Sequence, residues 1–421
     1  MRTVKWNPFL SGVAMLLGGV LLWAGAAHAD ISSTNAAAIV VFPKLVVDTS
    51  DGTDTIIQLT NTAPHAVNVR CFYVDANGHC SNAPTVICDP GQPSIEYCTP
   101  PGYCVPGWVE TDFFFRLTAN QPIVWTVSEG LAGVDFPLAD NTGIGGEFNT
   151  GSIPQASEDP MIGELKCVEV GEDEMPVDSN DLKGEATIEL LDAGEGIDIQ
   201  GYNAIGIQAI PGHCSGDASI SCTADSDCQV ESDQGPCVPV NNRDNTLVIG
   251  GPEAEYNGCP NNLILDHFFD DAPVLNSTVR TLLTLVPCSQ DFFTQTCVTT
   301  TVQYLVYNEF EQRFSTSRPL TCFSELQLSD IDTRLGDDPE NNYASIFNIN
   351  VEGTLTGQTV IRAVADSDPT KTPGHGLLGV VHEFHRLAEA PNSIFSAAYM
   401  LDQRGSRTQA DIMLMPQPSP Q

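Results

Sequence analysis

The 421-residue sequence has few positive charges and no long apolar run after its first 29 residues. It has 17 lysines and arginines against 54 aspartates and glutamates, a formal net charge of −37. Phosphate backbones repel such a chain, so we expect no nucleic-acid partner. No later segment reaches the roughly 18 uninterrupted apolar residues of a membrane-spanning helix. We therefore expect no membrane insertion once the leader is removed.

The sequence also lacks the short motifs of common catalytic sites. It contains no G-x-S-x-G, no P-loop and no C-x-x-C. "VVDTSDG" (46–52) departs from the aspartic-protease D-[ST]-G box and has no second copy. "HEFH" (382–385) is one residue short of H-E-x-x-H, and on a strand His382 and His385 would point to opposite faces. We expect no catalytic activity; the alternative is a hydrolase whose site is built from loops.

The first 29 residues have the pattern of a secretory signal peptide. Arg2 and Lys5 precede the apolar run "FLSGVAMLLGGVLLWAGA", and "AHA" ends at Ala29 with small residues at the positions that set cleavage. Cleavage takes the formal charge from −37 to −39, because it removes two cations and no acid. The pattern predicts an exported chain that is secreted, periplasmic or associated with the cell surface.

All 14 cysteines follow this leader, and an even number in an exported chain predicts disulfides, up to seven of them. Eight fall in residues 78–106 and 212–239, which we call cassette 1 and cassette 2. Both cassettes open with G-H-C-S, place the second cysteine eight positions after the first, and close with G-x-C-V-P. The cassette cysteines are Cys80, Cys88, Cys98 and Cys104, and Cys214, Cys222, Cys228 and Cys237.

Zinc is the alternative to disulfides in the cassettes, with His79 and His213 as further ligands. Zinc ligands usually come in pairs two to four residues apart, whereas five to nine residues separate successive cassette cysteines. We therefore predict two disulfides inside each cassette, because short loops close most readily. Three pairings stay open for each cassette. We also predict that Cys288 and Cys297 close one turn, and the sequence leaves Cys71, Cys167, Cys259 and Cys322 without assigned partners.

Two pairs of alternating segments indicate strands and an internal duplication. "TIIQLTN" (55–61) and "VNVRCFYVD" (67–75) are matched by "TLLTLVP" (281–287) and "TTVQYLVYN" (300–308). In this match Leu283 falls where Ile57 does, and Leu285 falls where Leu59 does. The same match places Asn308 at the position of Asp75.

Further matches extend the duplication. "LKGEATIEL" (182–190) is similar to "LTGQTVIRA" (355–363), "AIGIQAI" (204–210) to "LLGVVHE" (377–383), and "LILD" (263–266) to "YMLD" (399–402). Gly184 and Gly206 are 22 positions apart, as are Gly357 and Gly379. The pattern predicts an all-β protein of two tandem Greek-key β-sandwich domains. We place them at residues 30–266, with both cassettes as loop insertions, and at residues 267–421.

The strand motifs resemble those of immunoglobulin- or fibronectin-like sandwich modules in secreted bacterial proteins, where "TTIxLTN", "VxVxFYDxxG" and "GxAxI" recur. "CTADSDC" (222–228) also resembles short C-x-x-D-x-D-C boxes in secreted proteins of myxobacteria. The resemblance implies a fold and says almost nothing about activity. We expect a structural or interaction protein at or outside the cell surface, because of the duplication, the cassettes, the acidic charge and the missing catalytic motifs.

Two groups of side chains are candidates for binding. Tyr97, Tyr103 and Trp108 lie in or beside cassette 1 and could form a surface for a protein or a glycan. The alternative is that Trp108 and the run Phe113–Phe115 anchor the cassette on the sandwich. Asp48, Asp51 and Asp54 are weak calcium candidates, because "DTSDGTD" also has the composition of a turn. We expect no cofactor; a calcium- or carbohydrate-binding module is the alternative function.

Overall fold

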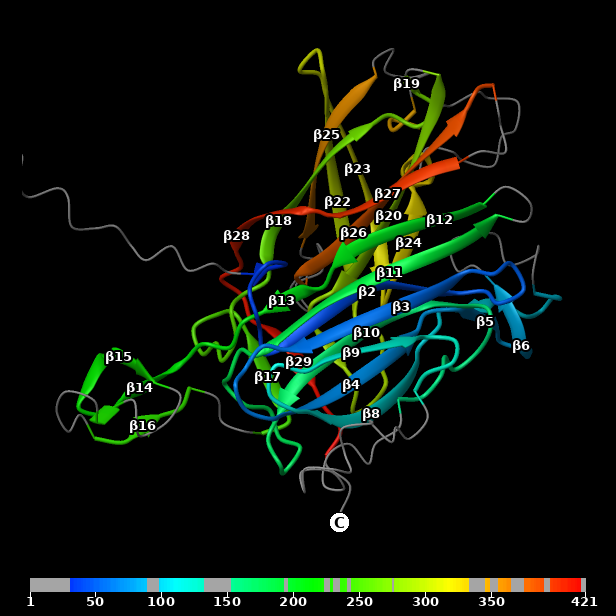
Figure 1. Cartoon of the computed structure of the whole chain (residues 1–421). Coiled ribbons are helices and arrows are strands. Elements are labelled where there is room, and N and C mark those ends of the chain that lie inside the picture. The colour runs from blue at the N-terminus through cyan, green and yellow to red at the C-terminus, as the bar shows by residue number, and fades with distance from the viewer. Residues whose placement is uncertain are drawn as a thin grey trace, which may run out of the picture.

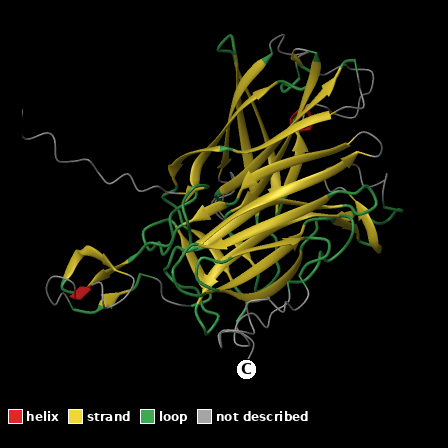
Figure 2. Ribbon diagram, viewed as in Figure 1, coloured by secondary structure: helices red, strands yellow, loops and turns green. Residues whose placement is uncertain are grey.

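The computed structural model is all-β, as predicted, and within the residues it describes the helical structure is limited to short turns such as η4 (Leu328–Asp330) (Figures 1 and 2). The predicted signal peptide and Tyr97 lie outside the described residues. Within them, no helix has the length and apolar character needed to cross a membrane. The structure describes residues 31–88, 98–131, 153–192, 196–222, 228–229, 235–240, 244–274, 276–332, 345–348, 355–364, 375–389 and 394–417.

The N-terminal half forms two antiparallel sheets, which we call A1 and B1. Sheet A1 has the strand order β1 (Ile31–Ser32), β13 (Ile205–Ile207), β2 (Ile39–Val47), β10 (Met161–Val170), β4 (Val67–Asp75) and β8 (Val109–Leu117). Sheet B1 has the order β12 (Gly196–Asn203), β11 (Leu182–Asp192), β3 (Asp54–Asn61) and β9 (Pro122–Thr126). An apolar core that includes Phe42, Ile57 and Trp125 draws on both sheets, so the two form one layered unit.

The C-terminal half forms a second pair of sheets, A2 and B2. Sheet A2 has the order β28 (Asp402–Ser406), β18 (Pro260–Phe268), β25 (Thr356–Val364), β22 (Thr299–Asn308) and β23 (Arg313–Thr321). Sheet B2 has the order β27 (Ile394–Met400), β26 (Leu377–Leu387) and β20 (Ser277–Pro287), and β20 also pairs with β24 (Ser324–Gln327) and β19 (Pro273–Val274). Leu265, Leu283 and Tyr304 belong to the core that these sheets share.

The two sheet pairs have the same strand order. In sheets A1 and A2, the correspondence is β13 with β28, β2 with β18, β10 with β25, β4 with β22, and β8 with β23. In sheets B1 and B2, it is β12 with β27, β11 with β26, β3 with β20, and β9 with β24. Every pairing between these strands is antiparallel in both halves. The match of β3 with β20 and of β4 with β22 agrees with the sequence comparison.

The later matches in the sequence comparison align each strand with the wrong partner, shifted by one strand. Gly184 lies opposite Leu59 and Gly379 lies opposite Leu285, so these two glycines correspond to each other. Gly357 lies opposite Asn308, and its counterpart opposite Asp75 is Gly163. The predicted pairs Gly184 with Gly357 and Gly206 with Gly379 are therefore wrong, as is the match of "LILD" with "YMLD". The error arose because successive strands repeat a similar pattern about every 22 residues.

The predicted boundary at residue 266 falls inside β18, which pairs with β25 and β28 of the second half. The connection between the halves is residues 208–259, and cassette 2 lies in it. Cassette 1 lies between β4 and β8, as a loop insertion of the first half. Cassette 2 follows β13, the last strand of the first sheet pair, instead of interrupting that pair.

Sheet A1 is buried on both faces. One face lines the core shared with B1, and the other packs on a small sheet of β17 (Thr246–Ile249), β29 (Asp411–Leu414) and β21 (Gln290–Asp291). Phe72 stacks on Phe292 at 4.2 Å between ring centroids, which joins A1 to the second half of the chain. This double burial accounts for the nearly continuous apolar run of β2, "IVVFPKLVV".

Polar contacts also join the two halves. Lys44 Nζ of β2 lies 2.8 Å from Glu325 Oε2 of β24, and both side chains are largely buried. His382 of β26 is buried and hydrogen-bonded to Gln200 of β12. Burial lowers the pKa of His382 to about 2, so the ring is neutral. Figure 1 shows β12 and β27 side by side at this junction. The two halves therefore form one body.

All 14 cysteines are in seven disulfides, which indicates folding in an extracellular or periplasmic oxidising compartment. Cys71 pairs with Cys167 across the neighbouring strands β4 and β10. The predicted bond between Cys288 and Cys297 is wrong: Cys259 pairs with Cys288, and Cys297 pairs with Cys322. Thr299 lies opposite Thr321 in the β22–β23 hairpin, so Cys297 and Cys322 meet at its open end.

The corresponding glycines make a prediction about packing. A Cβ at Gly184 would lie 2.6 Å from Phe42 Cζ and 3.0 Å from the Gln58 carbonyl oxygen, and one at Gly379 would lie 2.7 Å from the Thr284 carbonyl oxygen. We expect Gly184→Ala and Gly379→Ala each to destabilise the protein by about 1–3 kcal/mol. Thermal and urea unfolding measure this loss.

The matched control is Gly201→Ala in β12, because its added Cβ would have its nearest neighbour at 3.9 Å. We expect this variant to unfold within about 0.5 kcal/mol of the wild type. Equal stability of Gly184→Ala and Gly201→Ala would contradict the packing described for β11.

Candidate functional site

The two cassettes have the same internal structure. Cassette 1 is a three-stranded sheet of β6 (Ala83–Cys88), β5 (Gly78–Cys80) and β7 (Cys104–Val105). Cassette 2 repeats it with β15 (Asp217–Cys222), β14 (Gly212–Cys214) and β16 (Cys237–Val238). His79 lies opposite Val105 and His213 lies opposite Val238. The sequence similarity between the cassettes therefore extends to their strand register.

Disulfides within each cassette join the first cysteine to the third and the second to the fourth. The bonds are Cys80–Cys98 and Cys88–Cys104 in cassette 1, and Cys214–Cys228 and Cys222–Cys237 in cassette 2. This pairing agrees with the prediction of disulfides internal to each cassette. Each cassette also has a small buried cluster of its own, made mainly of these sulfur atoms and separate from the cores of the sheets.

The cassettes differ in how they meet the body. In cassette 1, His79 Nε2 lies 3.1 Å from Glu158 Oε2, and Glu158 belongs to the segment that leads into β10. Asn77, just before the cassette, donates hydrogen bonds to Glu158 Oε1 at 2.6 Å and to the Pro160 carbonyl at 2.7 Å. Cassette 2 instead projects away from the sheets, at the lower left of Figure 1.

A buried carboxyl group lies behind the contact of cassette 1. Asp75, the last residue of β4, accepts hydrogen bonds from Ser157 Oγ at 2.6 Å and from the Asn77 N–H at 3.0 Å. Burial raises the pKa of Asp75 to about 6, the two hydrogen bonds lower it, and the Glu158 carboxyl raises it further. The base of cassette 1 therefore rests on a carboxyl that is protonated in mild acid.

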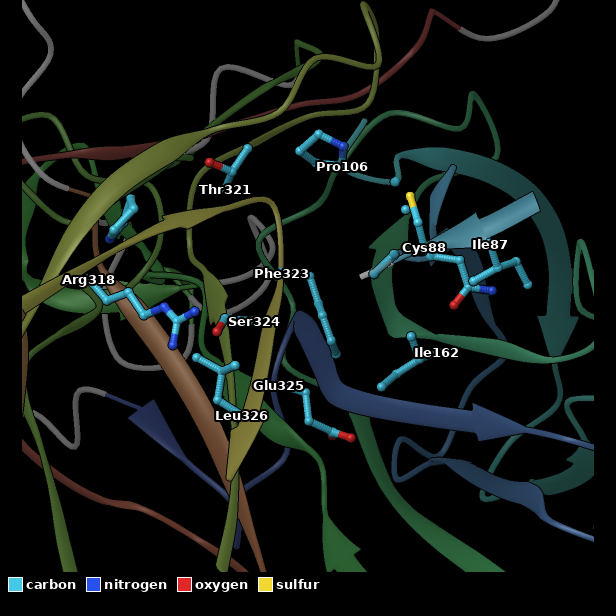
Figure 3. Close-up of a pocket in the computed structure, with 15 residues that line it drawn as sticks. Ile87, Cys88, Pro106, Ile162, Arg318, Thr321, Phe323, Ser324, Glu325 and Leu326 are labelled. Carbon is cyan, nitrogen blue, oxygen red and sulfur yellow. The ribbon is translucent and has the colours of Figure 1, made fainter. Parts of the chain in front are cut away.

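A cleft of about 630 Å³ separates cassette 1 from β23 and β24 of the second half. Figure 3 shows its two walls. Ile87, Pro106 and Ile162 contribute to the wall formed by the cassette and sheet A1, and Arg318, Phe323 and Leu326 contribute to the opposite wall. Sequence analysis identified none of these six residues as a binding site, because the walls come from segments more than 150 residues apart.

The charged side chains of the cleft already have partners in the protein. Glu325 pairs with Lys44 and accepts a hydrogen bond from Thr284 Oγ1 at 2.7 Å, and Arg318 donates to the Asp330 carbonyl. Among the described strands, β24 pairs only with β20, so its other edge is open. Apolar side chains beside an open strand edge can hold a peptide in extended conformation.

Three titratable side chains near the base of cassette 1 do not line this cleft. Asn77 and Gly78 line the cleft, whereas Asp75, His79 and Glu158 are absent from its lining.

A second cleft, of about 540 Å³, lies over β18, β22 and β25 and includes His267. Both ring nitrogens of His267 are hydrogen-bonded, to the Phe268 carbonyl and to Thr359, and burial lowers its pKa to about 4.

The predicted aromatic surface is only partly present. Tyr103 is 62% exposed on cassette 1, where it is open to a partner. Trp108 is half-buried and stacks on Phe292 with ring centroids 6.3 Å apart, so it anchors the base of the cassette. Phe113 and Phe115 are buried in the core between A1 and B1, and Phe114 packs on the opposite face of A1. The anchoring alternative therefore describes Trp108 and the phenylalanine run.

The three calcium candidates lie at the turn between β2 and β3. Asp48 accepts hydrogen bonds from Ser50 Oγ and from the Asp51 N–H, and Asp54 accepts them from Ser128. These contacts are those of a turn, which is the interpretation that the composition favoured.

His382 and His385 both lie on β26, where His382 is buried and His385 contacts Glu383 at 2.8 Å. The two histidines therefore do not form a shared site.

Comparisons with known proteins assign no family to the chain. No family model matches the sequence, and no curated protein gives a significant match. Among solved structures, the 11S allergen from Cocos nucifera is 10% identical, with 86% of this chain and 87% of that chain covered and a TM-score of 0.14. The CupB6 tip adhesin from Pseudomonas aeruginosa is 9% identical, with 88% and 93% covered and a TM-score of 0.12. These scores carry no conclusion about fold or function.

The raised pKa of Asp75 predicts a pH-dependent stability. Asp75 titrates near 3.8 when unfolded and near 6 when folded, so the folded chain binds more protons between these values and loses stability as pH rises through them. Asp75→Asn removes this titration. We compare the unfolding free energy of Asp75→Asn with that of the wild type at pH 4 and at pH 7. Between these values we expect the difference to shift by about 2–3 kcal/mol in favour of the variant, because only the wild type loses stability as Asp75 ionises.

Chemical denaturation at each pH measures this difference. The control is Val105→Ala, an exposed change on cassette 1 that removes no titratable group and whose difference from the wild type should stay constant with pH. A pH-independent difference for Asp75→Asn would show that this carboxyl is solvated.

Proposed function

We propose that this chain is an exported interaction protein without catalytic activity, acting at or outside the cell surface. The disulfides support an extracellular or periplasmic location. Cassette 2 carries the interaction role, because it projects from the body, is braced by its own two disulfides and has a buried cluster separate from the sheets. Loops braced on a rigid β-scaffold are a usual place for recognition.

We further propose that each half is a Greek-key β-sandwich of immunoglobulin-like type and that the chain arose by tandem duplication. The matching strand order of A1 with A2 and of B1 with B2 supports this. The correspondence of Gly184 with Gly379 and of Gly163 with Gly357 supports it at the level of single residues. On this view the sandwiches are the scaffold and the cassettes are the parts that vary.

Three alternatives are open to test. A hydrolase would need its acid and base in a cleft. Asp75, Glu158 and His79 lie outside the lining of the first cleft. Asp266, His267 and Glu383 line the second cleft, where both ring nitrogens of His267 are hydrogen-bonded within the protein. A calcium-binding module predicts a melting temperature that falls when a chelator is added. A glycan-binding module would use exposed aromatic rings such as Tyr103.

The cleft beside β24 favours a second interaction site, for a peptide in extended conformation. Its open strand edge offers backbone hydrogen bonds, and Phe323 and Ile87 offer apolar contacts on opposite walls. This second site and cassette 2 lie on different parts of the molecule, so removal of one leaves the other in place.

Deletion of each cassette tests the role of cassette 2. Replacing residues 212–239 by a short Gly-Ser linker removes no residue of the sheet cores, so we expect the melting temperature of the body to stay within about 3 °C of the wild type. We also expect the amount of protein retained on the exporting cells to fall at least severalfold. Differential scanning calorimetry and immunoblotting of the cell and medium fractions measure the two quantities.

The same replacement of residues 78–106 is the comparison. It removes the contact of His79 with Glu158 and one wall of the cleft, so we expect a lower melting temperature for this variant. Full retention on cells without cassette 2 would disprove its role in binding, and unfolding of the body on its removal would make it structural.

A further inference from the structure

Cassette 1 is seated at one corner of the first sheet pair. We call this the first corner: residues 75–77 at the end of β4 and residues 157–162 leading into β10. Asp75 lies opposite Gly163, and the pairing continues past the strand end, where the Ala76 N–H donates to the Ile162 carbonyl at 2.8 Å. This register places Asn77 opposite Met161, and they are 7% and 2% exposed.

The second sheet pair has an equivalent corner with no cassette. The second corner is residues 308–312 after β22 and residues 355–357 at the start of β25. Asn308 lies opposite Gly357, as Asp75 lies opposite Gly163. The chain turns from β22 into β23 through four residues, whereas the first half inserts cassette 1 at this point.

The two corners differ in what they leave exposed. The pairing of β22 with β25 ends at Asn308 and Gly357; Phe310 lies beyond it in the turn into β23, and Leu355 lies two residues before Gly357. Phe310 is 66% exposed and Leu355 is 40% exposed. Beside them, Phe268 and Tyr307 line the cleft of about 540 Å³. Two apolar side chains of the second corner are thus open to solvent, whereas Asn77 and Met161 of the first corner are buried, Met161 in the core between A1 and B1.

The second corner also offers an acidic group. Glu309 is exposed, and its Oε2 accepts a hydrogen bond from Thr356 Oγ1 at 3.2 Å. In the first corner the carboxylate of Glu158 contacts His79 of cassette 1. A carboxylate is therefore available at the bare corner for a histidine on an incoming cassette.

Cassette 2 has the structure of cassette 1 but is not seated on a corner. His213 occupies the register position of His79 and is partly exposed. The connection before cassette 2 is held in place, because the Gln208 carbonyl accepts from the Asn257 N–H and the Ile210 N–H donates to the Glu255 carbonyl. Figure 1 shows β14–β16 at the lower left and β22, β23 and β25 in the upper half. In this structure cassette 2 therefore lies apart from the second corner of its own chain.

We propose that cassette 2 of one molecule docks on the second corner of another copy, with His213 facing Glu309 and the cassette covering Phe310 and Leu355. This rests on the proposed function of cassette 2 as an interaction module and names its partner as a second copy of the chain. The seating of cassette 1 on the first corner is the template for the contact.

The proposed contact joins two different surfaces of the molecule, so a pair of molecules still has one free surface of each kind. Each added molecule brings a free second corner and a free cassette 2, and association continues into open chains or rings. The exported chain carries a formal charge of −39, so copies repel one another at low salt. We expect association to strengthen as ionic strength rises, because salt screens this repulsion.

Sedimentation velocity on the exported chain tests the proposal, across a range of concentrations and at low and high salt. We expect wild-type mass to rise with concentration and salt. Phe310→Asp should stay monomeric, as should a second variant, Leu355→Ser, and the chain lacking residues 212–239. The matched control is Phe293→Asp, which changes a phenylalanine 61% exposed in another turn and should associate as the wild type does.

Mixing separates this contact from other modes of association. Phe310→Asp retains cassette 2, and the cassette-2 deletion retains the second corner, so their mixture should form a species of twice the monomer mass and nothing larger. A monomeric wild type at high concentration and salt would overturn the proposal, as would unchanged association of Phe310→Asp or a mixture that stays monomeric.

The cell-retention measurement separates this proposal from the proposed function. If cassette 2 is needed for retention on cells but the wild type does not self-associate, the partner is another molecule and only the self-docking proposal fails. If retention does not need cassette 2, the proposed function fails.

Discussion

The burial of sheet A1 on both faces is the constraint on which the rest of the structure depends. Phe42 faces the core shared with B1, whereas Phe72 faces the second half of the chain and stacks on Phe292. A buried polar contact crosses the same boundary: Lys166 of β10 is fully buried and donates a hydrogen bond to the carbonyl of Pro287 at 3.1 Å. Removing the second half would expose a sheet face that is apolar along its length.

This constraint explains where the cassettes are found. A segment inserted into a strand of A1 would disturb two cores at once, whereas a segment beyond the end of β4 or in the connection after β13 disturbs neither. Each cassette is too small to form an apolar core of its own, and its disulfides supply the cross-links that a small domain needs. The cassettes can therefore differ in position while the body stays the same.

The sequence predicted what depends on local pattern and missed what depends on strand pairing. Alternating residues identified β3 and β4, and local spacing indicated the disulfides inside each cassette. Cys71 and Cys167 could not be paired from spacing, because 96 residues separate them and only the register of β4 and β10 brings them together. The later repeats were matched one strand out of step, because similar glycine-containing strands recur at nearly equal intervals.

The binding surfaces were the least predictable part. Arg318 and Phe323 have no motif around them, and they face cassette 1 only because the two halves pack together. Trp108 had the composition of a binding residue but stacks on Phe292, a residue 184 positions later. Phe310 stands in a short polar turn and is exposed there, and no sequence pattern marks it as a contact residue.

Native-state hydrogen exchange, read by mass spectrometry on the intact disulfide-bonded protein, tests the central claim most directly. If A1 is the doubly buried centre of one body, the amides of β2 and β10 should exchange last and only on global unfolding. The amides of β14 and β15 in cassette 2 should exchange earlier, through local opening that leaves the body folded. Exchange of β10 as fast as that of the cassette, or cassette amides protected until the body unfolds, would contradict the account.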